Sequence, residues 1–255
     1  MKPTVEICAC SLEDCRKAQK GGAGRVELNG GICAGGLTPT TALLKSVKKE
    51  VEIPIVCMVR PRGSGFCYNE DEKALMFEEA KDLLEAGADG LAFGFLNEDS
   101  TVDVPNTKKM ADLIHHYGRE AVFHRAFDDT PDYDAAAKAL IECGIDRVLT
   151  SCEAAEAPDA PESLAHLQKT YGDQLQIQPG GGVRSHNVEK LIRQTGVHNV
   201  HSSARAWGID KTGVRYPVRD ENLAATRYEI CSLEEIMALV EAANRALYLF
   251  IRSIF

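Results

Sequence analysis

The sequence predicts an α/β fold, a (β/α)8 (TIM) barrel that forms a single domain over residues 1–255. Short apolar runs alternate with segments of helical periodicity along the whole chain, and eight such repeats fit. Glycine closes several helical segments and the next strand follows within a few residues, as in right-handed βαβ units of a parallel sheet. A length of 255 residues suits a barrel of eight such units.

Eight short runs rich in β-branched and other apolar residues are the predicted strands. In chain order they are Val5–Ala9, Arg25–Leu28, Ile55–Val59, Gly90–Phe93, Ala121–His124, Arg147–Thr150, Gln176–Gln178 and Val200–His201. The first strand–helix joint carries no G-x-G-x-x-G motif, which argues against a dinucleotide-binding open sheet.

Segments of helical periodicity lie between these strands. Helices are expected near Ser11–Lys20, Thr40–Lys49, Asp71–Ala86, Asn106–Tyr117, Asp132–Cys143, Glu162–Tyr171, His186–Arg193 and Ser232–Arg252. Gly87 and Gly144 directly follow two of them, because glycine tolerates the left-handed backbone that ends many helices.

A long excursion at 202–231 separates the last strand from the last helix. Its aromatic and basic residues favour ordered contact, as a lid or an interface, over disorder. They are Arg205, Trp207, Lys211, Arg215, Tyr216, Arg219, Arg227 and Tyr228. The apolar tail at 246–255 is expected to be a docked helix end or a subunit contact, and we expect a homo-oligomer.

The composition restricts the partners of this protein. A net charge of -9 and the lack of a basic tract argue against nucleic acid. No apolar run approaches the ~20 residues of a membrane helix, and the N-terminal residues are no signal peptide. Nine cysteines, an odd number, predict free thiols in a reducing compartment. We therefore expect a cytoplasmic protein.

The most informative motif is a run of three glycines, Gly180, Gly181 and Gly182, that follows the seventh strand. Glycine permits positive φ angles and brings backbone N–H groups close to a ligand. A helix begins soon afterwards, with Ser185 as the expected N-cap. Loops after strands 7 and 8 of a barrel often hold an anionic group, which favours an anion site here. The alternative is a tight turn that needs glycine for its geometry alone.

Charged and polar residues gather at the predicted carboxyl ends of the strands. The candidate anion ligands are Arg60, Arg62, Arg125, the three glycines, His201, Ser202 and Ser203, because the planar arginine fork suits phosphate or carboxylate. The candidate acids and bases are Glu6, Glu27, His124 and Asp128. The alternative for these four residues is that they neutralise the arginines in a buried ionic network.

Cys8 and Cys10 form a C-x-C pair on the first strand. Two thiolates with this spacing can bind a soft ion such as Cu(I). The structural alternative is that Cys8 is a small core residue. The chain has no C-x-x-C pair and no H-x-x-x-H motif, so a tetrahedral zinc site is not indicated.

Eight motifs together resemble the CutC family over about residues 4–204. They are Val5-Glu6-Ile7-Cys8, Gly22-Ala23-Gly24-Arg25-Val26-Glu27-Leu28, Gly35-Gly36-Leu37-Thr38-Pro39-Thr40, Met58-Val59-Arg60-Pro61-Arg62-Gly63, Phe123-His124-Arg125-Ala126-Phe127-Asp128, Leu149-Thr150-Ser151, Gly180-Gly181-Gly182-Val183 and His201-Ser202-Ser203-Ala204. The resemblance implies a (β/α)8 barrel and a role in copper homeostasis with Cu(I) bound through cysteine. Cys8 matches a cysteine of many members. Asn29 stands where some members have a second one, so Cys10 or Cys33 would have to supply the other thiol.

Three functions are therefore considered. The first is a copper homeostasis protein of the CutC type that binds Cu(I) through Cys8 and a neighbouring thiol. The second is a TIM-barrel enzyme that acts on a small phosphorylated or carboxylated substrate by general acid–base chemistry. The third is a protein-interaction scaffold that uses residues 202–231 and the apolar tail. Whether the protein is an enzyme stays open at this point.

Overall fold

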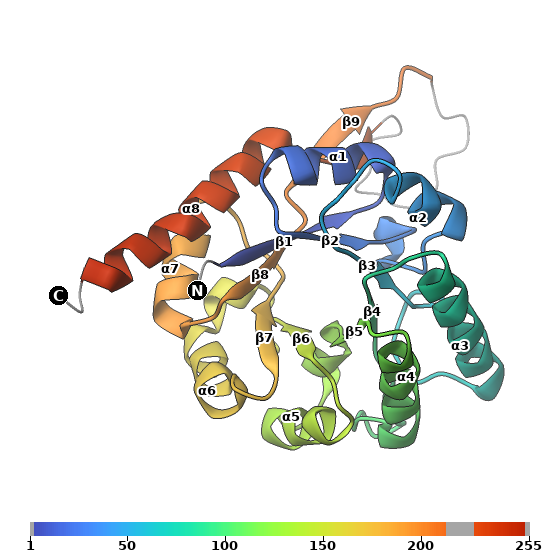
Figure 1. Cartoon of the computed structure of the whole chain (residues 1–255). Helices are drawn as coiled ribbons and strands as arrows, with labels where there is room; N and C mark the ends of the chain where they lie inside the picture. The colour runs from blue at the N-terminus through green and yellow to red at the C-terminus, as the bar shows by residue number, and fades with distance from the viewer. Residues whose placement is uncertain (1–2, 213–226, 253–255) are drawn as a thin grey trace.

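The computed structural model describes residues 3–212 and 227–252, and for residues 247–252 the backbone alone. Eight parallel strands form a nearly closed barrel inside a ring of helices (Figure 1). The barrel strands are β1 (Thr4–Ala9), β2 (Arg25–Leu28), β3 (Ile55–Met58), β4 (Gly90–Phe93), β5 (Glu120–Phe123), β6 (Arg147–Thr150), β7 (Gln176–Pro179) and β8 (Asn199–Ser202). The predicted (β/α)8 fold is confirmed.

The helices alternate with these strands as predicted and begin or end within two residues of their expected bounds. They are α1 (Leu12–Lys20), α2 (Thr41–Val47), α3 (Glu70–Glu85), α4 (Val104–His116), α5 (Tyr133–Glu142), α6 (Pro161–Tyr171), α7 (Val188–Thr195) and α8 (Leu233–Arg252). Polar side chains cap several of them, and Asn69 with Glu72 forms a complete capping box on α3. The sequence predicts Ser185 as the N-cap of α7, but the N-cap is Asn187. The hydroxyl and the amide of Ser185 both donate to the Glu235 carboxylate instead.

The strand order is β7-β6-β5-β4-β3-β2-β1-β8, so the ladder is continuous from β7 round to β8. These two end strands lie side by side, but within the described residues no ladder joins them. A side-chain hydrogen bond bridges them instead, from Asn199 Nδ2 to Gln176 Oε1 at 3.2 Å. We call this line the β7/β8 seam.

The main hydrophobic core lies between the strands and the surrounding helices. On β1, Val5, Ile7 and Ala9 belong to it, whereas Glu6 and Cys8 face the barrel interior because successive side chains of a strand alternate. The interior itself is divided. A small apolar cluster fills one side, and it consists of Val56, Met58, Ala92 and Val122. Ionic and polar side chains fill the other side, around Glu6 and Arg147.

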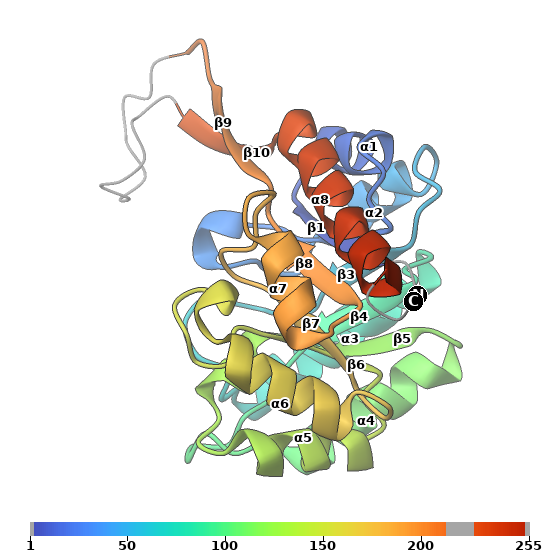
Figure 2. The same cartoon turned by 90° about the vertical axis from the view of Figure 1, so that its left-hand side faces the viewer.

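Part of the excursion at 202–231 is a two-stranded antiparallel ribbon, formed by β9 (Arg205–Ile209) and β10 (Arg227–Cys231). The ribbon projects away from the barrel (Figure 2). Trp207, Ile209 and Tyr228 on it are exposed. Residues 213–226, which include Arg215, Tyr216 and Arg219, and residues 253–255 of the apolar tail lie outside the described residues. No helix in the described ranges is long and apolar enough to cross a membrane.

Candidate functional site

A cavity of about 440 Å³ opens at the carboxyl ends of the barrel strands. Most of the residues predicted from the sequence line it, namely Cys8, Glu27, Arg60, His124, Arg125, Gly181, Gly182, His201, Ser202 and Ser203. Five other predicted site residues do not line the cavity, namely Glu6, Cys10, Arg62, Asp128 and Gly180. Cys10 instead lines a small adjacent cavity with Cys8 and Cys231.

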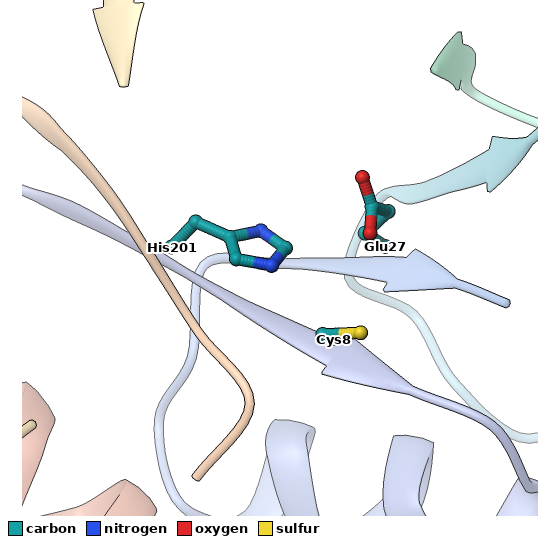
Figure 3. Close-up of side chains that lie close together, drawn as sticks. All are labelled: Cys8, Glu27 and His201. Carbon is teal, nitrogen blue, oxygen red and sulfur yellow. The ribbon is translucent and has the colours of Figure 1, made fainter. Parts of the chain in front are cut away.

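Cys8, Glu27 and His201 converge in this cavity from three neighbouring strands, β1, β2 and β8 (Figure 3). One ligand atom from each, a thiol sulfur, a carboxylate oxygen and an imidazole nitrogen, lies within 4.8 Å of the other two. The register explains the convergence, because Cys8 pairs with Glu27 across one ladder and Glu6 with His201 across the other. Such a thiol, carboxylate and imidazole group can hold a metal ion or move a proton.

Glu6 lies inside the barrel, beside this group, and it orients the His201 imidazole. Its Oε1 is 2.8 Å from His201 Nδ1 and accepts from Gln178 at 3.1 Å, while its Oε2 accepts from Arg25 and Arg147 at 2.5 and 2.9 Å. Burial raises the pKa of Glu6, but Arg25 and His201 outweigh it and lower that pKa to about 2. Glu6 therefore stays ionised, and it leaves Nε2 as the His201 nitrogen available for chemistry.

Burial and neighbouring charges shift the pKa values of Cys8, Glu27 and His201 away from their ordinary values. Burial raises the pKa of Glu27, and the negative charge of Glu6 adds to this effect. Burial alone would lower the pKa of His201, but Glu27 and Glu6 reverse that effect and raise it. The Cys8 thiol has a pKa well above its ordinary value because of the neighbouring Cys10 thiol, burial and the charge of Glu27. In the absence of a cation, the thiol therefore keeps its proton at neutral pH.

His124 is a neutral imidazole in the cavity wall. Burial, with a smaller contribution from the positive charge of Arg60, lowers its pKa to about 3. Its Nδ1 accepts from the Ala126 amide at 3.1 Å, so Nε2 carries the proton. This Nε2 is buried and, in the described part of the chain, meets no hydrogen-bond acceptor. A donor left in this state is suited to an oxygen atom of a ligand.

The three predicted arginines differ in their roles. Arg60 lines the cavity, but carbonyl oxygens of residues 34–36 and of Ser64 hold its guanidinium. Arg62 forms an ion pair with Glu72, outside the cavity wall. Arg125 reaches the cavity and forms a 2.7 Å ion pair with Asp128.

Asp128 is a structural carboxylate. It accepts from the Thr150 hydroxyl at 2.5 Å and from the backbone amide and hydroxyl of Ser151 at 3.0 Å each. These bonds, with that from Arg125, occupy both of its oxygens, and they tie the end of β6 to the loop after β5. The geometry therefore fits the alternative that this residue neutralises an arginine.

The three glycines occupy a confined turn. A methyl group on Gly180 would lie 2.4 Å from Leu149 Cδ1, and one on Gly182 would lie 2.5 Å from the Glu156 side chain. Gly181 and Gly182 have φ angles of 96° and 69°, which disfavour other residues. The turn thus requires glycine for its own geometry, and it also places Gly181 and Gly182 in the cavity wall.

Sequence reasoning did not select Arg184 or Glu156 as site residues, yet both line the cavity. Arg184 directly follows Val183 at the end of the glycine motif, and this place in the sequence could have identified it as a site residue. Its Nη1 donates to the hydroxyls of Ser202 and Ser203, both at 3.1 Å, and so joins the loops after β7 and β8. No sequence pattern marks Glu156 as a site residue, because it lies in an irregular loop after β6.

Comparison with known proteins shows one consistent relationship. The model of the CutC family matches residues 3–206. A CutC protein of Treponema denticola is 42% identical over 200 residues, which cover 78% of this chain and 80% of that protein. Another, of Chromobacterium violaceum, is 35% identical over 252 residues, 96% of this chain and 100% of that protein. A solved CutC structure from Streptococcus agalactiae, described as that of a proposed copper homeostasis protein, has a TM-score of 0.74 at 28% identity and covers 79% of this chain and 98% of its own.

Proposed function

This chain belongs to the CutC family, and on that basis we propose that it serves copper homeostasis by holding a copper ion at Cys8, Glu27 and His201. The observation that carries the proposal is the convergence of three ligand atoms within 4.8 Å. Copper is here the cargo of the protein. The proposal adds a carboxylate and an imidazole to the predicted thiol pair, since Glu27 and His201 offer ligand atoms near Cys8 and the Cys10 thiol also lies beside it.

The donor set fits a copper ion. Thiolate and imidazole are the ligands that copper prefers, and the Cys8 thiol would release its proton on binding. The bond between His201 Nδ1 and Glu6 matches the usual environment of a metal-binding histidine, whose second nitrogen donates to a carboxylate. Asn29 Nδ2, 2.8 Å from Glu27 Oε2 and 3.4 Å from Cys8 Sγ, fixes the other two ligands.

A Cu(I) titration against a competing chelator tests this proposal. We expect one tight site in the wild type, and a loss of at least tenfold in affinity for Cys8→Ser and for His201→Gln. Cys67→Ser is the matched control, because Cys67 is exposed and does not line either cavity. Cys10→Ser decides whether the second thiol of the predicted pair takes part. Unchanged affinity in Cys8→Ser would contradict the proposal.

A second function, catalysis on a small anionic substrate, is favoured by the arginines in the cavity wall. Arg125 and Arg184 both line it, and His124 offers there an N–H donor that has no partner among the described residues. In this proposal Glu27 and His201 move protons, and Glu6 acts on the reaction only by orienting His201. Metal binding and acid–base chemistry would then share two side chains, Glu27 and His201.

Thermal-shift screening of phosphosugars and sugar acids, followed by NMR detection of turnover, tests the catalytic function. A substrate should raise the melting temperature of the wild type and of Glu27→Gln, but be converted by the wild type alone. Cys67→Ser should behave as the wild type in both measurements. A screen in which no compound stabilises the wild type would remove the support for this function.

A further inference from the structure

We propose that the anionic ligand of the second function is a phosphate monoester, and that its phosphoryl group binds in a cradle formed by residues 181–184 and 202–203. This inference rests on that proposed function, because it assumes an anionic ligand in the cavity. It goes further in naming the chemical class of the ligand, the atoms that hold it and a side chain that opposes it.

The glycine turn presents a row of free backbone amides. In the described part of the chain, the amides of Gly181, Gly182 and Val183 donate no hydrogen bond to a protein atom. The turn is held through its carbonyls instead, since Gly181 accepts from the Ala157 amide and Gly182 from Asn187 Nδ2, both at 2.9 Å. Successive free N–H groups next to positive φ angles form a concave anion site.

Two guanidinium groups flank this row of amides. Arg184 donates through Nη1 to Ser202 and Ser203, whereas its Nη2 and Nε have no acceptor within the described residues. Arg125 lies on the other side, where a methyl group built on Gly181 would be 3.5 Å from its Nη1. Arg184 has no carboxylate partner within the described residues, whereas Arg125 keeps its ion pair with Asp128 and adds Nη1 as a donor. The two side chains therefore offer N–H donors and one uncompensated positive charge to the dianion of a phosphate monoester.

The number of donors favours phosphate over carboxylate. The cradle offers three amides, the Ser203 hydroxyl and the two guanidinium groups, while the Ser202 hydroxyl donates to the Val183 carbonyl at 2.6 Å and helps to position Arg184. A carboxylate presents two oxygens in one plane, whereas a phosphoryl group presents three oxygens in a tetrahedral arrangement, so it can use donors that surround it. A cavity of about 440 Å³ leaves room beyond the cradle for the organic part of a small ester.

The rest of the cavity restricts that organic part. His124 Nε2 is a buried, protonated donor with no partner among the described residues, and only 3% of the His124 surface is exposed. It requires an acceptor, which a hydroxyl or carbonyl oxygen of the ligand would supply. The ligand class is therefore the phosphate ester of a small hydroxy or oxo compound, whose oxygens reach His124 and the group at Cys8, Glu27 and His201.

One carboxylate opposes the phosphate. The Glu156 side chain covers Gly182 so closely that a methyl group there would lie 2.5 Å from Glu156 Cβ and Cδ. Glu156 is exposed and belongs to an irregular loop, so it can move aside, but its charge repels a dianion. The structure thus predicts opposite effects for two changes at one site: loss of Arg184 weakens binding, and loss of the Glu156 charge strengthens it.

Isothermal titration of the copper-free protein tests the inference with glycerol 3-phosphate and glycerate as probes. The wild type should bind glycerol 3-phosphate about tenfold more tightly than glycerate. Arg184→Ala and the milder Ser203→Ala should weaken phosphate binding, the former by about tenfold or more, because charge-assisted hydrogen bonds are lost. Glu156→Gln should strengthen it about threefold.

Arg193→Ala and Glu153→Gln are the matched controls, since neither residue lines the cavity and both should bind as the wild type. Thermal unfolding shows which variants keep the native fold. Wild-type affinity in folded Ser203→Ala and Arg184→Ala, or equal binding of the two probes, overturns the phosphate cradle while leaving the anionic ligand in place. Binding of neither probe by the wild type overturns both. Copper titration of Arg184→Ala should remain normal in every case.

Discussion

The carboxylate of Glu6 and the imidazole of His201 form a buried pair inside the barrel, with Oε1 and Nδ1 2.8 Å apart. The same carboxylate also forms ion pairs with Arg25 and with Arg147, and Arg147 pairs with Glu120 as well. One side chain therefore fixes both the ionic interior of the barrel and the orientation of an imidazole in the cavity wall.

Glu6→Gln should lower the free energy of unfolding by about 3 kcal/mol at pH 7, because it leaves buried positive charge without its partner. Glu50→Gln is the control. It removes a charge from a pair with Arg16 in which both side chains are nearly half exposed, so a change below about 1 kcal/mol is expected. Urea unfolding of the two variants measures the difference. Equal effects would contradict a structural role for Glu6.

His124 should make the protein less stable as the pH falls. Its pKa is about 3 in the folded protein and 6.5 ordinarily, so below pH 6.5 the unfolded chain takes up a proton that the folded protein does not. Stability from the neutral imidazole is present above pH 6.5 and is lost progressively as the pH falls toward 3. His124→Gln should flatten the pH dependence of unfolding between pH 6.5 and 4.5, whereas His166→Gln, at an exposed histidine, should not.

Gly182→Ala should cost about 1–2 kcal/mol of stability, because alanine is strained at a φ of 69° and its methyl group meets Glu156. Gly65→Ala is the control, since a methyl group there meets nothing within 4 Å. Thermal or urea unfolding distinguishes the two. If both substitutions were neutral, the turn would not require glycine for its geometry.

Asn29→Cys should raise the affinity for Cu(I) at least tenfold. Asn29 Nδ2 lies 3.4 Å from Cys8 Sγ, so the substitution places a second soft ligand beside the first. Asn29→Ser is the control, because it removes the same amide without adding a thiol, and it should not strengthen binding. A gain in affinity for the serine variant would show that loss of the amide, rather than the added sulfur, is responsible.

The barrel was predictable because its signals are local. Each strand is a short apolar run between turn residues, and glycines such as Gly87 and Gly144 end the preceding helices with φ angles of 97° and 79°. The wall of the cavity followed largely from the same rule, since parallel strands place the residues at their carboxyl ends together.

The roles of individual side chains did not follow from the sequence, because they depend on partners distant in the chain. Glu6 contacts residues 141 and 195 positions away, Arg147 and His201, and these contacts make it structural. Arg62 follows its strand in the expected way, but it turns toward Glu72 at the start of α3. The spacing of residues in the sequence does not show whether an arginine faces the cavity or pairs with a carboxylate on a helix. The grouping of Cys8 with Glu27 and His201 likewise requires the register of three strands.

The β7/β8 seam has a consequence for motion. Since no ladder joins the two strands in the described part of the chain, the barrel can widen along this line without breaking backbone hydrogen bonds between strands. The glycine turn follows one strand and Ser202–Ser203 end the other, so a ligand held by both would act as a clamp across the opening. Amide hydrogen exchange near the seam should therefore be among the fastest in the barrel and should slow most when the cavity is filled.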